Sequence, residues 1–214
     1  MLDRGIYTLS EVRRYTKVPT QTLRNWFMPP SDRTDHRPVF RSQWDRVDGD
    51  FAVSFLNLIE AHVASLFRDK GIKSRDIRRA HEILKSRWKI EHPFAHADLR
   101  TDGKAIILAS GDDSDLLIDV IRNQMLFENA KPYLDRIVYG ASKMAESWSI
   151  ATGVQINPRI SFGAPTISHG GISTRIVANQ FLANGQDAHL VAGLFRITPQ
   201  SVINAYQFEQ YMLN

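Results

Sequence analysis

Two short amphipathic segments separated by a valine–proline step lie near the N-terminus, and they constrain the fold more than any other feature of the sequence. Thr8 and Glu11 have the spacing of a capping box, in which each residue's side chain bonds to the other's backbone amide. Val18-Pro19 ends the first segment, because proline lacks an N–H and restricts the residue before it. The pattern predicts a helix, a tight turn and a second helix.

The apolar positions of the two predicted helices fall on one side of each. They are Leu9, Val12 and Tyr15 in the first helix and Leu23, Trp26 and Phe27 in the second, for which Thr20 is the expected cap. In helix-turn-helix proteins the second helix enters the DNA major groove, where Gln and Asn can pair with adenine and Arg with guanine. The candidate recognition residues are therefore Thr20, Gln21, Thr22, Arg24 and Asn25. The alternative is an ordinary helical hairpin with a solvated polar face.

Positive charge is concentrated in the first half of the chain. Residues 1–100 carry 19 Lys and Arg against 13 Asp and Glu, a net charge of +6, whereas residues 101–214 carry 8 against 10, a net charge of −2. This asymmetry favours a polyanion-binding N-terminal half. The candidate phosphate contacts are Arg13, Arg14, Lys17, Arg33, Arg37 and Arg41.

The segment Ser31–Arg41 reads as turn-forming and basic residues followed by a short Pro-Val-Phe strand. It is typical of a wing beside a recognition helix, and the alternative is an exposed loop. Apolar residues at helical spacing then predict a helix over 54–71, closed by Gly71, and a second one opening at Ser74 with Ile77, Leu84 and Trp88 inward. These aliphatic helices are candidates for a homodimer seam.

The middle of the chain carries turn patterns but no recognisable chemistry. Asp102-Gly103 between apolar segments predicts a β-hairpin turn, and residues 116–134 have a mostly helical pattern. A second hairpin is expected between 136–140 and 146–150.

The helix–turn–helix pattern returns near the C-terminus with its charge removed. At an offset of 179 residues, Thr8–Phe27 aligns with Asp187–Tyr206, and Gln21 and Asn25 fall on Gln200 and Asn204. The first segment has a net charge of +3 and the second of zero, so the second is poorly equipped to displace counterions from DNA. Its aromatic residues suit a protein interface instead, or else fill the core of their own domain. They are Phe195, Tyr206, Phe208 and Tyr211.

The residue patterns give no support to an enzyme. His92 and His96 have the spacing of a helical metal-binding pair, but Pro93 lies between them and no third ligand follows, so we expect no metal and no cofactor.

Cysteine is absent, which suits a reducing cytosol. The sequence has no apolar secretion signal and no stretch long enough to span a bilayer, so we expect a cytoplasmic protein with no membrane partner.

The ordered set of helices and wing resembles the MerR-like winged helix-turn-helix. Together with the passage HPFAHADLRTDGKAIIL it resembles the N-terminal domain of VapB-like antitoxins over about residues 6–110. Residues 154–212 resemble the small domain commonly encoded beside PIN-like toxins. The sequence departs from these patterns at Pro19, where MerR-like proteins often carry Ser, at Asn25, where an aromatic residue is common, and at residues 173–177, which read Ser-Thr-Arg-Ile-Val in place of Gly-Thr-Arg-Ile-Pro.

The expected fold is mainly α (α+β). It comprises a winged helix-turn-helix domain over 1–92, a connecting region with β-hairpins over 93–152 and a small helical domain over 153–214. The resemblance implies a type II antitoxin that represses its own operator as a homodimer and neutralises a PIN-like RNase toxin. Arg159 and Arg175 are then candidates for occupying the acidic metal site of that toxin. The alternative is a MerR-like regulator whose C-terminal domain senses a small molecule or dimerises.

Overall fold

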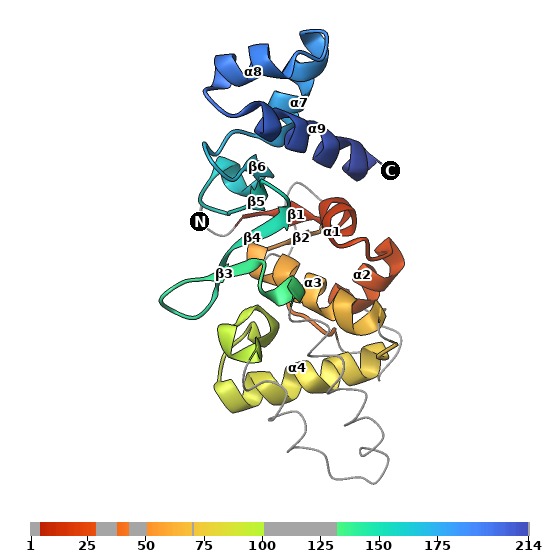
Figure 1. The fold of residues 1–214 in the computed structure, drawn as a ribbon. Helices are drawn as coiled ribbons and strands as arrows, with labels where there is room; N and C mark the ends of the chain where they lie inside the picture. Colours follow the sequence, from red (N-terminus) through yellow and green to blue (C-terminus); the bar gives the residue numbers. More distant parts are fainter. Residues whose placement is uncertain (1–4, 29–37, 43–50, 70, 101–131, 214) are drawn as a thin grey trace. The chain divides into compact units, whose positions relative to one another are not determined.

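The chain divides into two compact units in a computed structural model, which describes residues 5–28, 38–42, 51–69, 71–100 and 132–213 (Figure 1). One unit is Tyr7–Ala145, and the other comprises Glu146–Asn214 with Met1–Ile6. Most of the regular structure is helical, with two small sheets, in agreement with the expected mainly α fold class. Over the described ranges, no helix is both long enough and apolar enough to cross a membrane.

The N-terminal unit contains helices arranged around one long buried helix, α3. Its described elements are β1 (Tyr7–Thr8), α1 (Leu9–Thr16), α2 (Thr20–Phe27), β2 (Ala52–Val53), α3 (Phe55–Asp69), α4 (Ser74–Trp88), the short 3-10 helices η2 (Pro93–Ala95) and η3 (Ala97–Arg100), and β3 (Ile137–Tyr139). Strands β1 and β2 pair antiparallel, so that Tyr7 lies opposite Val53 and the start of α1 is tied to the start of α3.

Aromatic side chains fill the core between α2, α3 and η2. Phe40 makes edge-to-face contacts with Trp26, Phe94 and His81, and its ring also contacts that of Phe27. Trp26, Phe40 and Phe94 are fully buried. Packed aromatic pairs of this kind contribute stability beyond the area that they bury.

The two helices expected after residue 50 are present. Gly71 has a φ of +89° and its N–H donates to the carbonyl of Arg68, which confirms it as the C-terminal cap of α3. In α4, Ile77 and Leu84 are buried as predicted and Trp88 is half-buried. Helix α3 is buried along most of its length, and the homodimer seam expected on α3 and α4 stays a prediction.

The second sheet has the strand order β3-β4-β5-β6. Strands β4 (Ala145–Ala151), β5 (Val154–Ile156) and β6 (Thr166–Ile167) follow β3, and the presence of β3 and β4 as neighbours confirms the hairpin expected across 136–150. A register shift separates the Trp148–Ile156 and Ala151–Val154 pairs. The hairpin expected at Asp102-Gly103 and most of the helix expected over 116–134 lie outside the described residues.

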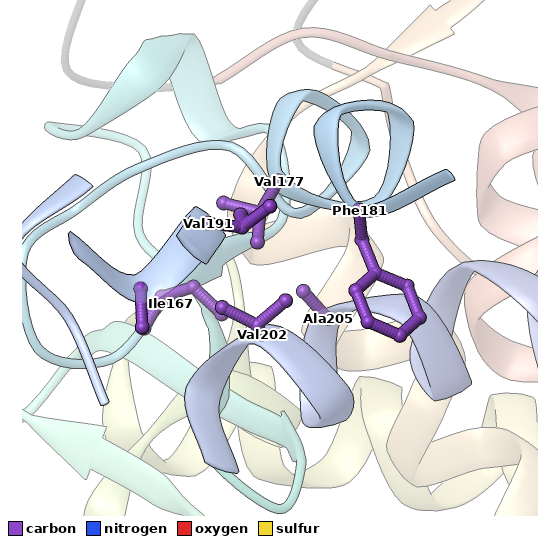
Figure 2. Packing of buried hydrophobic residues seen from close by; sticks show 7 residues of the cluster. Ile167, Val177, Phe181, Val191, Val202 and Ala205 are labelled. Atoms are coloured by element: carbon purple, nitrogen blue, oxygen red, sulfur yellow. The ribbon is translucent and has the colours of Figure 1, made fainter. Parts of the chain in front are cut away.

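Three helices form the C-terminal part of the second unit: α7 (Thr174–Ala183), α8 (Ala188–Phe195) and α9 (Pro199–Leu213). Between β5 and β6 lies the short 3-10 helix η4 (Ser161–Gly163). Figure 2 shows the side chains of α7, α8, α9 and β6 converging on one apolar cluster. Its labelled members are Ile167, Val177, Phe181, Val191, Val202 and Ala205. This cluster fixes the three helices to one another.

Candidate functional site

The capping box predicted at the start of α1 is present. The side-chain oxygen of Thr8 accepts a bond from the Glu11 amide at 3.2 Å, and the Glu11 carboxylate accepts from the Thr8 amide at 2.8 Å. The carboxylate of Glu11 is thus engaged with Thr8 at the cap of the helix. Arg13 and Arg14 follow on the last turn and both are exposed.

The turn between α1 and α2 is fixed by Lys17, whose backbone adopts the left-handed conformation with a φ of 57°. Its N–H donates to the carbonyl of Arg13 at 2.8 Å, and Val18 is completely buried beside it. The cap of α2 is Pro19, so the prediction of Thr20 as the cap was wrong. Thr20 is instead the first helical residue, because the fixed φ of proline ends the turn one residue earlier.

Helix α2 presents a polar face outward, as the sequence predicted. Leu23, Trp26 and Phe27 are buried, whereas Gln21, Arg24 and Asn25 are exposed and Thr22 is half-buried. One turn apart on this face, the side-chain amide of Gln21 donates to the amide oxygen of Asn25 at 3.1 Å.

Exposed cations collect on α1, the turn and α2. Arg13, Arg14, Lys17 and Arg24 are all exposed. Across the part of the chain that the structure describes, no acidic group forms an ion pair with any of the three arginines. A surface of unneutralised guanidinium groups beside an amide-bearing helix is suited to bind a polyanion that also carries hydrogen-bonding edges.

The expected wing is described only at its end. Arg33 and Arg37 lie outside the described residues, and Arg41 is exposed. The strand predicted over Pro38–Phe40 was wrong, because the N–H groups of Val39 and Phe40 both donate to the carbonyl of Trp26. This segment is a bend that buries the side chains of Val39 and Phe40 against the end of α2. Their backbone N–H groups bond to α2 and are therefore not available to pair with a neighbouring strand.

A buried polar cluster in the same unit as α1 and α2 was missed by the sequence reasoning. The carboxylate of Glu60, in α3, lies 2.8 Å from Nε2 of His81 in α4 and 2.9 Å from Nδ1 of His92 just before η2. Burial alone would raise the pKa of Glu60, but the two neighbouring histidines reverse the effect and lower the pKa below its usual value. The only signal in the sequence is an acidic residue at an otherwise apolar position of a helix.

This cluster also accounts for His92, which was considered as a metal ligand with His96. The Nδ1 atom of His92 is engaged with Glu60, whereas Nδ1 of His96 faces Asp98. Within the described ranges, no group of three or more His, Asp or Glu side chains is arranged to hold a metal ion.

The two arginines proposed from the C-terminal resemblance occupy different settings. Arg159 is exposed and its guanidinium lies 3.3 Å from the Glu146 carboxylate. Arg175 is exposed on the first turn of α7 and forms no ion pair with any described residue. Arg175 would therefore bind a new carboxylate at a lower free-energy cost than Arg159, because Arg159 would first have to leave Glu146.

The aromatic residues assigned to a protein interface are not all exposed. Phe195 and Tyr206 are half-buried and pack against the cluster of Figure 2, and only Tyr211 is largely exposed, at 60%. The assignment of Phe208 to a protein interface was wrong, and the alternative that it fills the core holds: Phe208 follows Val202 and Ala205 at helical spacing and shares their buried face. The sequence reasoning did not single out Leu190 and Leu194 of α8, which are 49% and 60% exposed.

The C-terminal segment Asp187–Tyr206, which aligns with Thr8–Phe27, also shares the helix cap and the turn conformation of that first segment. Asp187 caps α8 by accepting from the Leu190 amide, as Thr8 caps α1, and Arg196 adopts the left-handed conformation of Lys17. Gln200 donates to Asn204 at 2.9 Å. Asn204 is half-buried, and a Cβ built on Gly153 would lie 2.6 Å from its amide nitrogen, so the β4–β5 turn covers this amide.

The chain is similar to a curated protein and to a solved structure from the same organism. No family model matches the chain. Among curated proteins, the chain is 26% identical over an alignment of 228 residues to "Putative antitoxin VapB45" of Mycobacterium tuberculosis, covering 95% of this chain and 93% of the relative. Among solved structures, it resembles the crystal structure of Rv2018 from Mycobacterium tuberculosis, with a TM-score of 0.73 and 24% identity, covering 93% of this chain and 96% of that one. The fold is therefore shared over nearly the whole length.

Proposed function

We propose that this chain is the antitoxin of a type II toxin–antitoxin system, which binds operator DNA as an autorepressor and neutralises a PIN-like RNase toxin by protein–protein contact. The name of the relative from Mycobacterium tuberculosis supports an antitoxin, since the similarity extends over 95% of the chain. The two activities are assigned to the two compact units, the first to DNA and the second to the toxin.

The observation that carries the DNA assignment is the set of exposed, unneutralised arginines beside the polar face of α2. In this proposal α1, the turn and α2 form a MerR-like winged helix-turn-helix, and α2 enters the major groove. Arg13, Arg14, Lys17 and Arg41 contact phosphates, while the exposed side chains of α2 read base edges. A homodimer would place two such helices on half-sites about one helical turn apart.

The toxin assignment is supported by the surface of α7–α9. Its exposed apolar side chains include Leu190, Leu194 and Tyr211, and the helices α8 and α9 carry few charges. Desolvating such a surface costs little, which suits a protein interface more than a nucleic acid. Arg175 would supply a guanidinium to the carboxylates of the nuclease site, which blocks the place of the metal ion by charge-assisted bonds.

Co-purification of the full chain with the product of the neighbouring reading frame tests the proposal. We expect the full chain to retain a PIN-like nuclease and to suppress its hydrolysis of RNA. Arg175→Ala should restore RNA hydrolysis more than Arg159→Ala, which removes the same charge from a group already paired with Glu146. A neighbouring frame without a nuclease, or nuclease activity that the chain leaves unchanged, would exclude the antitoxin and favour the alternative of a regulator.

A further inference from the structure

The hydrogen bond between Gln21 and Asn25 gives the exposed face of α2 a defined chemical pattern. Gln21 donates one amide proton to the Asn25 oxygen at 3.1 Å, and both side chains are exposed. An amide oxygen has two lone pairs and an amide nitrogen two protons. Asn25 therefore retains one acceptor and two donors, which lie side by side, after it has accepted the bond from Gln21.

An adjacent acceptor and donor match the major-groove edge of adenine. Adenine presents the N7 acceptor beside the N6 amino donor, so an Asn amide can bind both atoms at once. Guanine presents two acceptors, N7 and O6, and would place one of them against the Asn oxygen. Restricting the Asn side chain before binding lowers the entropy that is lost when the contact forms.

We propose that Asn25 reads one adenine in the operator and that Gln21 is its positioning residue. This inference rests on the proposed binding of DNA by α2 and adds the base that the helix selects. Gln21 has a second amide proton that can donate to a neighbouring phosphate, which would fix the pair on the duplex.

The C-terminal repeat contains the same Gln–Asn hydrogen bond in a setting that we do not expect to bind DNA. Gln200 and Asn204 form the same pair at 2.9 Å. The Asn204 amide is covered by the β4–β5 turn at Gly153, and helices α8 and α9 contain no Lys or Arg. The second pair therefore stabilises its own helix and provides a control of matched chemistry.

The experiment selects bound sequences from a pool of randomised DNA duplexes with the full-length protein at constant salt. We expect one invariant adenine in each selected half-site. Asn25→Ala should bind the selected duplex about 5- to 150-fold more weakly, with little change in its affinity for unselected duplexes. Gln21→Ala should lose less affinity and keep the preference for adenine, whereas Gln200→Ala and Asn204→Ala should select as the wild type does.

Replacing the selected adenine by 7-deazaadenine removes the N7 acceptor and should weaken wild-type binding while leaving Asn25→Ala unaffected. Unchanged adenine selection by Asn25→Ala, or equal sensitivity of both proteins to 7-deazaadenine, overturns the inference. If the wild type binds duplexes in a salt-sensitive manner that requires Arg13 and Arg14, but selects no adenine, then only this inference fails. If no duplex is retained at all, the proposed function fails with it.

Discussion

The carboxylate of Glu60 lies 2.8 Å from Nε2 of His81, in the interior of the unit that carries α1 and α2. His92 bonds to the other oxygen of the same carboxylate at 2.9 Å. One buried group thus links α3, α4 and the start of η2. Breaking such a cluster leaves buried polar groups without partners, and this cost exceeds what an exposed ion pair contributes.

Glu60→Gln should lower the free energy of unfolding by about 3 kcal/mol, because an amide nitrogen would face a histidine that now donates to a carboxylate. Urea unfolding followed by tryptophan fluorescence measures the change. Glu91→Gln is the matched control, since Glu91 is exposed and pairs with Lys85 at the surface. Its effect should stay below about 1 kcal/mol. Equal losses in the two variants would show that the buried cluster does not hold the helices together.

The stability of the N-terminal unit should rise with pH between about 4 and 6.5. Burial, and secondarily the charge of Arg136, lowers the pKa of His62 from 6.5 to about 4. On acidification the unfolded chain takes up this proton first, so folding loses about 3 kcal/mol by pH 4. Glu60 acts in the same direction at lower pH, since its folded pKa is also lowered.

Urea unfolding at a series of pH values, with His62→Leu as the comparison, separates the two groups. The free energy of unfolding of His62→Leu should change less with pH between 4 and 6.5 than that of the wild type. Below pH 4 the variant should still lose stability, because Glu60 is unchanged. A wild-type profile that is flat from pH 4 to 6.5 would contradict the assignment of His62.

Lys17 and Arg196, which occupy equivalent left-handed turn positions, allow effects on stability to be separated from effects on DNA binding. Lys17 and Arg196 have φ values of 57° and 53°, a conformation that glycine adopts at lower cost. Lys17→Gly and Arg196→Gly should each raise the free energy of unfolding by about 0.5–1 kcal/mol. Only Lys17→Gly should weaken retention on duplex DNA. Thermal melts and filter binding test both variants, and a similar loss of DNA binding for Arg196→Gly would contradict the division of roles between the repeats.

Gly153 should tolerate no side chain. Its φ is +71°, and an added Cβ would lie 2.6 Å from the amide nitrogen of Asn204, so Gly153→Ala should cost about 1–2 kcal/mol. The control is Gly193→Ala, which should stabilise by about 0.5–1 kcal/mol, because nothing lies within 4 Å of its added Cβ in helix α8. Both changes are measured by urea unfolding. The contact is confirmed if Asn204→Ala recovers part of the loss, and it is excluded if the two effects are additive.

Local sequence patterns were sufficient to predict the helices that form the candidate interface. The capping box at Thr8 and the proline at position 19 act on neighbouring residues, so their consequences follow from spacing alone. The partners of Glu60 are 21 and 32 residues away, and the acceptor for Phe40 is the Trp26 carbonyl, so tertiary structure decides both. Phe208 was misassigned because α9 carries apolar residues on several faces, and its sequence does not show which face is buried.

The salt dependence of DNA binding tests the central claim most directly. Each phosphate contact that is lost should reduce the slope of log affinity against log salt by about 0.9. We expect Arg13→Ala with Arg14→Ala to reduce the slope by up to about 2, whereas Arg159→Ala with Arg175→Ala, which removes the same charge from the other unit, leaves it unchanged. Equal slopes for the wild type and both double variants would contradict the assignment of the duplex to α1 and α2.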